Sequence, residues 1–138
     1  MRLLVFVLVL LAACQQRTVS SSDVNNADTI TDTTLSGKWI LNSGLDTMPT
    51  REAFISFGPA KNIFTGNSGC NHMSGTYTRD GVKIQFNERI ILTKMACAEY
   101  NEYRFIDKLV TTNNYRLNGN TLQLRIDSIT ALTFQRKN

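Results

Sequence analysis

The stretch Leu122-Gln123-Leu124-Arg125-Ile126 alternates strictly between apolar and polar side chains. The same alternation recurs over residues 82–87 and 132–135, and every second residue from 53 to 57 is apolar. A period of two with one polar face is typical of a β-strand that is buried on one side only. Turn-forming residues such as Asp80-Gly81 and Asn118-Gly119-Asn120 separate these stretches. The pattern therefore predicts a mainly β domain of short antiparallel strands.

Residues 99–111 have a different period. The apolar residues at 105, 106, 109 and 110 recur at helical spacing. Glu99 and Glu102 lie near the expected start and Lys108 near the end, which suits the helix dipole. We therefore expect one helix from Glu99 to about Thr111, before the last strands. Because closure removes exposed sheet edges, we expect a small antiparallel β-barrel-like (lipocalin-like) domain whose helix covers an open end or a seam.

The triplet Gly37-Lys38-Trp39 opens the domain in an expected first strand. It resembles the Gly-x-Trp signature of lipocalins, in which a large ring closes one end of the barrel. The alternative is that Trp39 is a core residue with no role in ligand binding, and we favour it because so short a triplet is weak evidence by itself.

The N-terminus has the features of an export signal. Met1-Arg2 precedes an apolar run from Leu3 to Ala13, which is too short to cross a bilayer. The sequence Leu11-Ala12-Ala13-Cys14 resembles the bacterial lipobox, which implies cleavage before Cys14 and lipid on its thiol. The alternative is an ordinary secretory signal with a chance cysteine. We expect residues 1–13 to be a signal peptide and the mature protein to be anchored by its lipidated N-terminus.

Residues 14–34 are rich in Ser, Thr, Asn and Asp and have no apolar period. Such a segment buries too little surface to offset its ordering entropy, so we expect a flexible tether followed by a domain over residues 35–138. Gln15, rather than an aspartate, follows the cysteine, which in enterobacteria-like sorting favours the outer membrane. The formal net charge is only +4 and no long basic run occurs, so we expect no nucleic-acid partner.

Several motifs occur in order along the domain. Gly69-Cys70-Asn71 is followed by Ser74-Gly75-Thr76-Tyr77, then by Thr93-Lys94-Met95-Ala96-Cys97, and finally by a Tyr-x-Leu-x-Gly-x-Thr-Leu-x-Leu element over residues 115–124. This series resembles the META domain family, and the resemblance extends over residues 35–136. Two departures stand out: Ala98 replaces a proline that many members carry, and His72 replaces a frequent asparagine. A role for His72 therefore cannot be taken from the family.

Cys70 and Cys97 remain as an even pair once Cys14 carries lipid. An exported protein enters a compartment that permits disulfides, so a disulfide is the favoured interpretation. The rival is a zinc site made by Cys70, His72 and Cys97, which could hold the metal with one open position. The Cys-x-His spacing is unusual for structural zinc and no fourth ligand is evident. We expect neither metal nor cofactor.

The sequence contains no convergent set of catalytic residues. His72 is the only histidine, so every Ser-His or Cys-His pair would have to include it. Neither a Gly-x-Ser-x-Gly elbow nor a phosphate-binding glycine loop occurs. We therefore expect a protein that is not an enzyme.

The META resemblance implies a role in envelope stress or homeostasis without a defined molecular activity. We expect a non-enzymatic binding or interaction module, monomeric as a domain, with an envelope protein as a possible partner. One alternative is a carrier of small apolar ligands, which requires an unfilled apolar cavity. The other is an inhibitor of a cell-wall lytic enzyme, for which residues 46–51 and 62–68 are the candidate protruding loops.

Overall fold

A computed structural model describes residues 35–60 and 62–137 of the chain. The predicted signal peptide, Cys14 and the predicted tether lie outside the described residues. The elements in chain order are β1 (Gly37–Ser43), β2 (Phe54–Phe57), β3 (Ile63–Asn67), β4 (His72–Asp80), β5 (Lys83–Phe86), β6 (Ile91–Leu92), α2 (Glu102–Thr111), β7 (Asn114–Asn118), β8 (Thr121–Ile126) and β9 (Ile129–Arg136). None of the helices in the described residues is long and apolar enough to cross a membrane.

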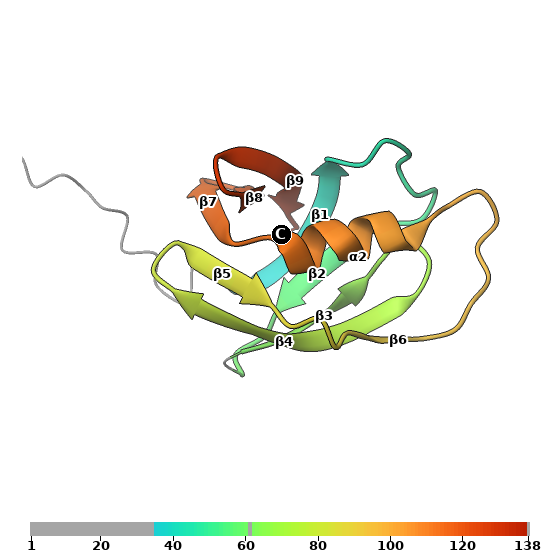
Figure 1. Cartoon of the computed structure of the whole chain (residues 1–138), viewed down its shortest axis with the longest axis horizontal. Helices are drawn as coiled ribbons and strands as arrows, with labels where there is room; N and C mark the ends of the chain where they lie inside the picture. Colours follow the sequence, from blue (N-terminus) through green and yellow to red (C-terminus); the bar gives the residue numbers. More distant parts are fainter. Residues whose placement is uncertain (1–34, 61, 138) are drawn as a thin grey trace, which may run out of the picture.

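The strands form an antiparallel sheet that closes into a ring. Its order is β3-β2-β1-β9-β8-β7-β5-β4-β6, and a further pairing of β3 with β4 closes it. The long strand β4 pairs with β3 on one side, and with both β6 and β5 on the other. Figure 1 shows this ring with α2 lying against it. The predicted mainly β, barrel-like fold with a helix before the last strands is confirmed.

The predicted period of two places apolar side chains inside the ring. In β8, Leu122 and Leu124 are fully buried while Gln123 and Arg125 are partly exposed. Val82, by contrast, lies in the turn between β4 and β5 and is 51% exposed, so this strand starts one residue later than its pattern indicates. The inner faces supply a continuous core that includes Trp39, Phe57, Phe64, Phe86, Tyr115 and Phe134.

The weakest point of the ring lies between β5 and β7, where Lys83 opposite Asn114 is the single paired position. Helix α2 covers this seam: Phe105 and Leu109 are fully buried, and Gln85 Nε2 on β5 donates to the Val110 carbonyl at 2.8 Å. The helix begins at Glu102 rather than at Glu99. Asn101 caps it by accepting a hydrogen bond from the Tyr103 amide, and this cap sets its start.

Trp39 is completely buried in β1. Its Nε1 donates to the Leu35 carbonyl at 2.7 Å, and the Arg136 guanidinium lies over its ring, 4.2 Å from the centroid. Trp39 is therefore a core residue whose one polar atom is satisfied within the chain.

Of the two segments predicted as protruding loops, only residues 46–51 form one. The prediction for residues 62–68 is wrong, because most of this segment is strand β3, held between β2 and β4. Phe64 and Gly66 face the interior while Ile63 and Thr65 face out. Its glycine and polar residues resemble a loop in composition, but Gly66 fits a close approach instead: a Cβ there would lie 2.2 Å from the Phe54 carbonyl oxygen.

Candidate functional site

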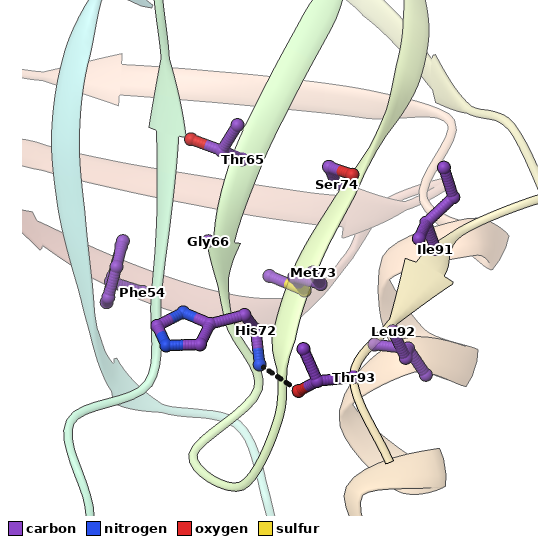
Figure 2. A pocket seen from close by; sticks show the side chains of 9 residues that line it. All are labelled: Phe54, Thr65, Gly66, His72, Met73, Ser74, Ile91, Leu92 and Thr93. Carbon is purple, nitrogen blue, oxygen red and sulfur yellow. Dashed lines mark hydrogen bonds between the residues drawn. The ribbon is translucent and has the colours of Figure 1, made fainter.

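His72 opens β4, and its side chain is exposed on the outer face of the ring. It borders a surface groove of about 380 Å³, shown in Figure 2, which we call the outer groove. The lining residues are Phe54, Thr65, Gly66, His72, Met73, Ser74, Ile91, Leu92 and Thr93. The His72 backbone amide donates to Thr93 Oγ1 at 3.1 Å. No hydrogen bond of the imidazole itself is found within the described part of the chain.

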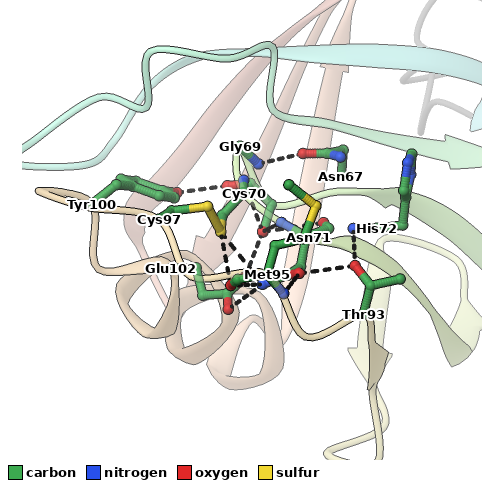
Figure 3. The surroundings of a disulfide bond; sticks show 11 residues. Asn67, Gly69, Cys70, Asn71, His72, Thr93, Met95, Cys97, Tyr100 and Glu102 are labelled. Atoms are coloured by element: carbon green, nitrogen blue, oxygen red, sulfur yellow. Dashed lines mark hydrogen bonds between the residues drawn. A yellow bond between two sulfur atoms is a disulfide. The ribbon is translucent and has the colours of Figure 1, made fainter.

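Cys70 and Cys97 form a disulfide with their Cα atoms 5.9 Å apart (Figure 3). Cys70 belongs to the four-residue turn that joins β3 to β4, and Cys97 to the segment that leads from β6 to α2. The predicted disulfide is confirmed. The rival zinc site is wrong in this structure, because the bonded sulfurs are no longer free thiolates. In residues 35–60 and 62–137, no three His, Cys, Asp or Glu side chains form a group that could hold a metal.

Asn71 is the centre of the polar contacts beside the disulfide (Figure 3). It is 1% exposed. Its Oδ1 accepts from the Met95 amide at 2.7 Å and from Thr93 Oγ1 at 2.8 Å. Its Nδ2 donates to the Met95 carbonyl at 3.2 Å and to Glu102 Oε1 at 2.8 Å. A carboxylate only accepts, so Glu102 fixes which end of the amide faces the helix.

Glu102 joins this turn to the helix. Its Oε1 accepts from Asn71 and its Oε2 accepts from Ser68 Oγ at 2.7 Å, so each carboxylate oxygen accepts a hydrogen bond from the turn. Its place in the first turn of α2 also lets the helix dipole stabilise the negative charge. We call Ser68, Asn71, Thr93, Met95 and Glu102 the Asn71 cluster. The side chains of Ser68, Asn71, Thr93 and Glu102 bind one another or the Met95 main chain, so the cluster connects the β3–β4 turn, the segment after β6, and α2.

Tyr100 packs against the same turn and donates its hydroxyl to the Ser68 carbonyl at 2.6 Å. Burial raises the pKa of Tyr100 to about 12, and the nearby negative charge of Glu102 adds to this rise. The phenol therefore stays protonated and continues to donate at ordinary pH.

Gly69 is required by the shape of the turn. Its φ of +94° lies in a region that side chains disfavour, and an added Cβ would lie 2.3 Å from Pro49 Cβ. The turn is thus pressed against the loop of residues 46–51, whose Met48 is 42% exposed. Gly69, Cys70 and Asn71 act together as one tight connection.

The second motif segment lies on the surface. Met95 is 48% exposed and Ala96 is also exposed, although the Met95 main chain is bound at both ends by Asn71. A hollow of about 460 Å³ beside the disulfide is lined by Cys70, Met95, Cys97, Glu99, Tyr100, Asn101, Glu102 and Tyr103.

Thus all the motif residues predicted from the sequence (Gly69, Cys70, Asn71, Met95, Ala96 and Cys97) converge at one end of the barrel. Sequence reasoning missed the parts of Ser68, Tyr100 and Glu102, and assigned Glu102 only to the helix dipole. The signal that could have revealed Glu102 is an acid in the first turn of a helix that follows the second cysteine closely.

A family model described as the META domain matches residues 29–138. The chain belongs to the META domain family. This META-domain chain is similar to a protein from Burkholderia xenovorans solved by NMR, with 23% identity and a TM-score of 0.62 over 78% of this chain and 86% of that one. It is also similar to the crystal structure of a DUF4847 family protein from Bacteroides vulgatus, with 17% identity and a TM-score of 0.54 over 75% of this chain and 96% of that one. Both likenesses establish the fold alone. No curated protein matches the sequence.

Proposed function

We propose that this META-domain chain is a lipid-anchored envelope protein that acts by binding a partner and not by catalysis. The observation that carries the proposal is the Asn71 cluster. Its polar groups bind one another, and each carboxylate oxygen of Glu102 accepts one of these bonds, from Asn71 or from Ser68. Because these groups hold one another in one arrangement, the cluster is suited to keeping a binding surface in shape.

The anchoring part of the proposal rests on residues 11–14 and on the disulfide. Cys14 completes the lipobox-like sequence, and a Cys70–Cys97 disulfide suits a protein exported to an oxidising compartment. Two or more acyl chains would give stable attachment, most favourably in the outer membrane. The META family membership supports a role in envelope stress or homeostasis.

The carrier alternative is disfavoured by the packing of the barrel. Trp39, Phe57, Phe86 and Phe134 are each at most 2% exposed, and their rings occupy the interior that an apolar ligand would need. The inhibitor alternative keeps one supporting observation, which is the loop of residues 46–51. Met48 is 42% exposed there, and the neighbouring Pro49 is packed against the turn at Gly69. A rigid loop with an exposed apolar tip suits insertion into another protein.

The test compares the full-length chain with its Cys14→Ser variant in a bacterial host. The wild type should fractionate with membranes and gain the mass of acyl chains, whereas the variant should lose both properties and keep its disulfide. Crosslinking of intact cells followed by mass spectrometry should then recover a reproducible envelope protein with the wild type. Normal processing of Cys14→Ser followed by membrane fractionation would contradict the anchoring, and recovery of no envelope partner would contradict the interaction role.

The inhibitor alternative predicts a separate result. Addition of the purified chain should slow the hydrolysis of cell-wall sacculi by a lytic enzyme, and Met48→Ser should remove the effect. Thr47→Ser, a neighbouring change on the same loop, is the matched control.

A further inference from the structure

The outer groove lies on the solvent-facing side of β2, β3, β4 and β6. The sheet register places Phe54, Asn67 and His72 in one row across the three strands. Ser56, Thr65 and Ser74 form the next row. The first row holds an aromatic ring, an amide and an imidazole, and the second row holds three hydroxyl groups. The groove lining combines the hydroxyls of Thr65, Ser74 and Thr93 and the imidazole of His72 with a larger apolar surface. The apolar part comes from Phe54, Met73, Ile91 and Leu92, and the lining contains no carboxylate, ammonium or guanidinium group.

Three polar side chains of the groove have unused hydrogen-bonding capacity. The hydroxyls of Thr65 and Ser74 and the imidazole of His72 form no hydrogen bond with the rest of the described chain, and Figure 2 shows them around the same hollow. Each hydroxyl can donate one bond and accept two, and the imidazole can both donate and accept. Thr93 differs, because its hydroxyl already bridges the His72 amide and Asn71 Oδ1.

Phe54 supplies an apolar surface at one side of the groove. Lys38 approaches its ring from β1, with Nζ 3.7 Å from the ring centroid. Figure 2 shows the His72 side chain, from β4, pointing toward the same ring. Glu52 binds Lys38 Nζ at 2.6 Å and Lys137 Nζ at 3.2 Å, which holds the ammonium group in place. These contacts stabilise one orientation of the ring, so the apolar surface is formed before any ligand arrives.

The chemistry of the lining selects among ligands. An extended peptide binds by adding its main chain to a free strand edge, but β2, β3 and this part of β4 are each paired on both sides. Strand β6 pairs with β4 alone, and at two residues its other edge is too short for strand addition. An anion would find no lysine or arginine in the lining itself, and the nearby Lys38 ammonium is already paired with Glu52. A purely apolar molecule would strip water from Thr65, Ser74 and His72 without replacing its hydrogen bonds, which is unfavourable.

We propose that the outer groove binds a neutral sugar ring of a glycan strand. Such a ring carries hydroxyls around its rim, which match Thr65, Ser74 and His72, and C–H groups on its face, which pack on Phe54. The volume of about 380 Å³ falls within the range of small-molecule sites. The inference rests on the proposed function only for the location, because an envelope protein is held close to glycan strands and tethering raises their local concentration.

The probe is chitotetraose, a neutral tetramer of N-acetylglucosamine, titrated into the purified lipidated chain by calorimetry in a detergent without a sugar headgroup. We expect a dissociation constant on the order of 1 mM for an open site of this kind. The double variant Thr65→Val/Ser74→Ala should weaken binding about tenfold, because it removes two hydroxyls from the solvent face and keeps the shape of the floor.

Thr76→Val is the matched control, since Thr76 is exposed on β4 outside the groove lining and the change is the same in kind. It should leave the affinity unchanged. His72→Ala, a second exposed position, should also weaken binding and guards against a folding defect in the double variant, which circular dichroism checks directly. Equal affinity in all variants, no heat with the sugar, or heat with inorganic phosphate instead would each overturn the proposal. Because the titration uses purified protein, absence of sugar binding alongside normal membrane fractionation would remove the sugar site and leave the proposed anchoring intact.

Discussion

The β3–β4 turn and the β7–β8–β9 meander both reverse the chain between antiparallel strands, but they are stabilised in different ways. The turn depends on particular residues: a disulfide, a buried asparagine and a glycine pressed against Pro49. The meander depends on a repeated pattern, with two-residue turns at Gly119-Asn120 and Asp127-Ser128 and alternating buried leucines. Replacement of a single polar residue should therefore lower the free energy of unfolding strongly in the turn and only slightly in the meander.

The largest effect should come from removal of the disulfide. The bond closes a loop between residues 27 apart, and in the entropic account this restricts the unfolded chain by about 3.5 kcal/mol. Cys70→Ser/Cys97→Ser should lower the free energy of unfolding by that amount in urea denaturation. A thiol reductant should bring the wild type to the same value and leave the double variant unchanged. A loss below about 1 kcal/mol would show that the Asn71 cluster holds the turn without it.

Asn71→Ala should follow at about 3 kcal/mol, because it leaves the Met95 amide and one oxygen of Glu102 without their buried partner. Asn118→Ala in the meander is the matched control. Asn118 is exposed at the end of β7, and its loss should change the free energy of unfolding by less than about 0.5 kcal/mol. Equal effects at the two asparagines, measured by urea denaturation, would remove the distinction between the regions.

Two glycines with positive φ allow the same comparison for the backbone. Gly69→Ala should cost about 2 kcal/mol or more, since it adds a clash with Pro49 to an unfavourable φ. At Gly119 the φ is +55° but the space around it is open, so Gly119→Ala should cost only about 1 kcal/mol. Thermal unfolding measures both. Repetition of Gly69→Ala in a Pro49→Gly background should recover part of the loss if the clash is real.

The smallest effect is a dependence on alkaline pH. Burial raises the pKa of Tyr100 from 10.0 to about 12, so the folded chain keeps the phenol protonated while the unfolded chain ionises. The stabilisation is fully present below pH 10 and is lost as the pH rises toward 12. Tyr100→Phe should flatten this part of the stability curve, whereas Tyr103→Phe, at a 74% exposed position, should not. Parallel curves for Tyr100→Phe and wild type would contradict this assignment.

The sequence predicted well the features that repeat locally. The alternation at 122–126 became β8, and the Asn118-Gly119-Asn120 signal became the turn before it, because burial on one face imposes a period of two on the chain itself. The helix was also expected, but its start moved from Glu99 to Glu102. Glu99 has a φ of +65°, which no helical residue adopts, and Asn101 provides the cap.

The contacts of the candidate site were less predictable, because they join residues that no local pattern relates. Glu102 binds Asn71, 31 residues earlier in the chain. From the sequence alone, an acid in the first turn of a helix is explained equally well by the helix dipole. Strand β3 was missed for a related reason. Gly66 has a low strand propensity and Thr65 is polar, so the segment does not look like a strand. The glycine is explained only by the close approach of Phe54 and Met73.

The closure of the ring has a consequence for the time at which the domain folds. Strand β1, near the start of the domain, pairs with β2 on one side and with β9 on the other, and the Lys137 amide donates to the Lys38 carbonyl at 2.9 Å. Strand β1 therefore keeps one edge unpaired until β9, at the far end of the domain, has been placed beside it. Such a long-range pairing forms slowly and leaves an edge open to other chains in the meantime. Pairing of β9 with β1 is thus the step that removes this open edge and with it the risk of aggregation through β1.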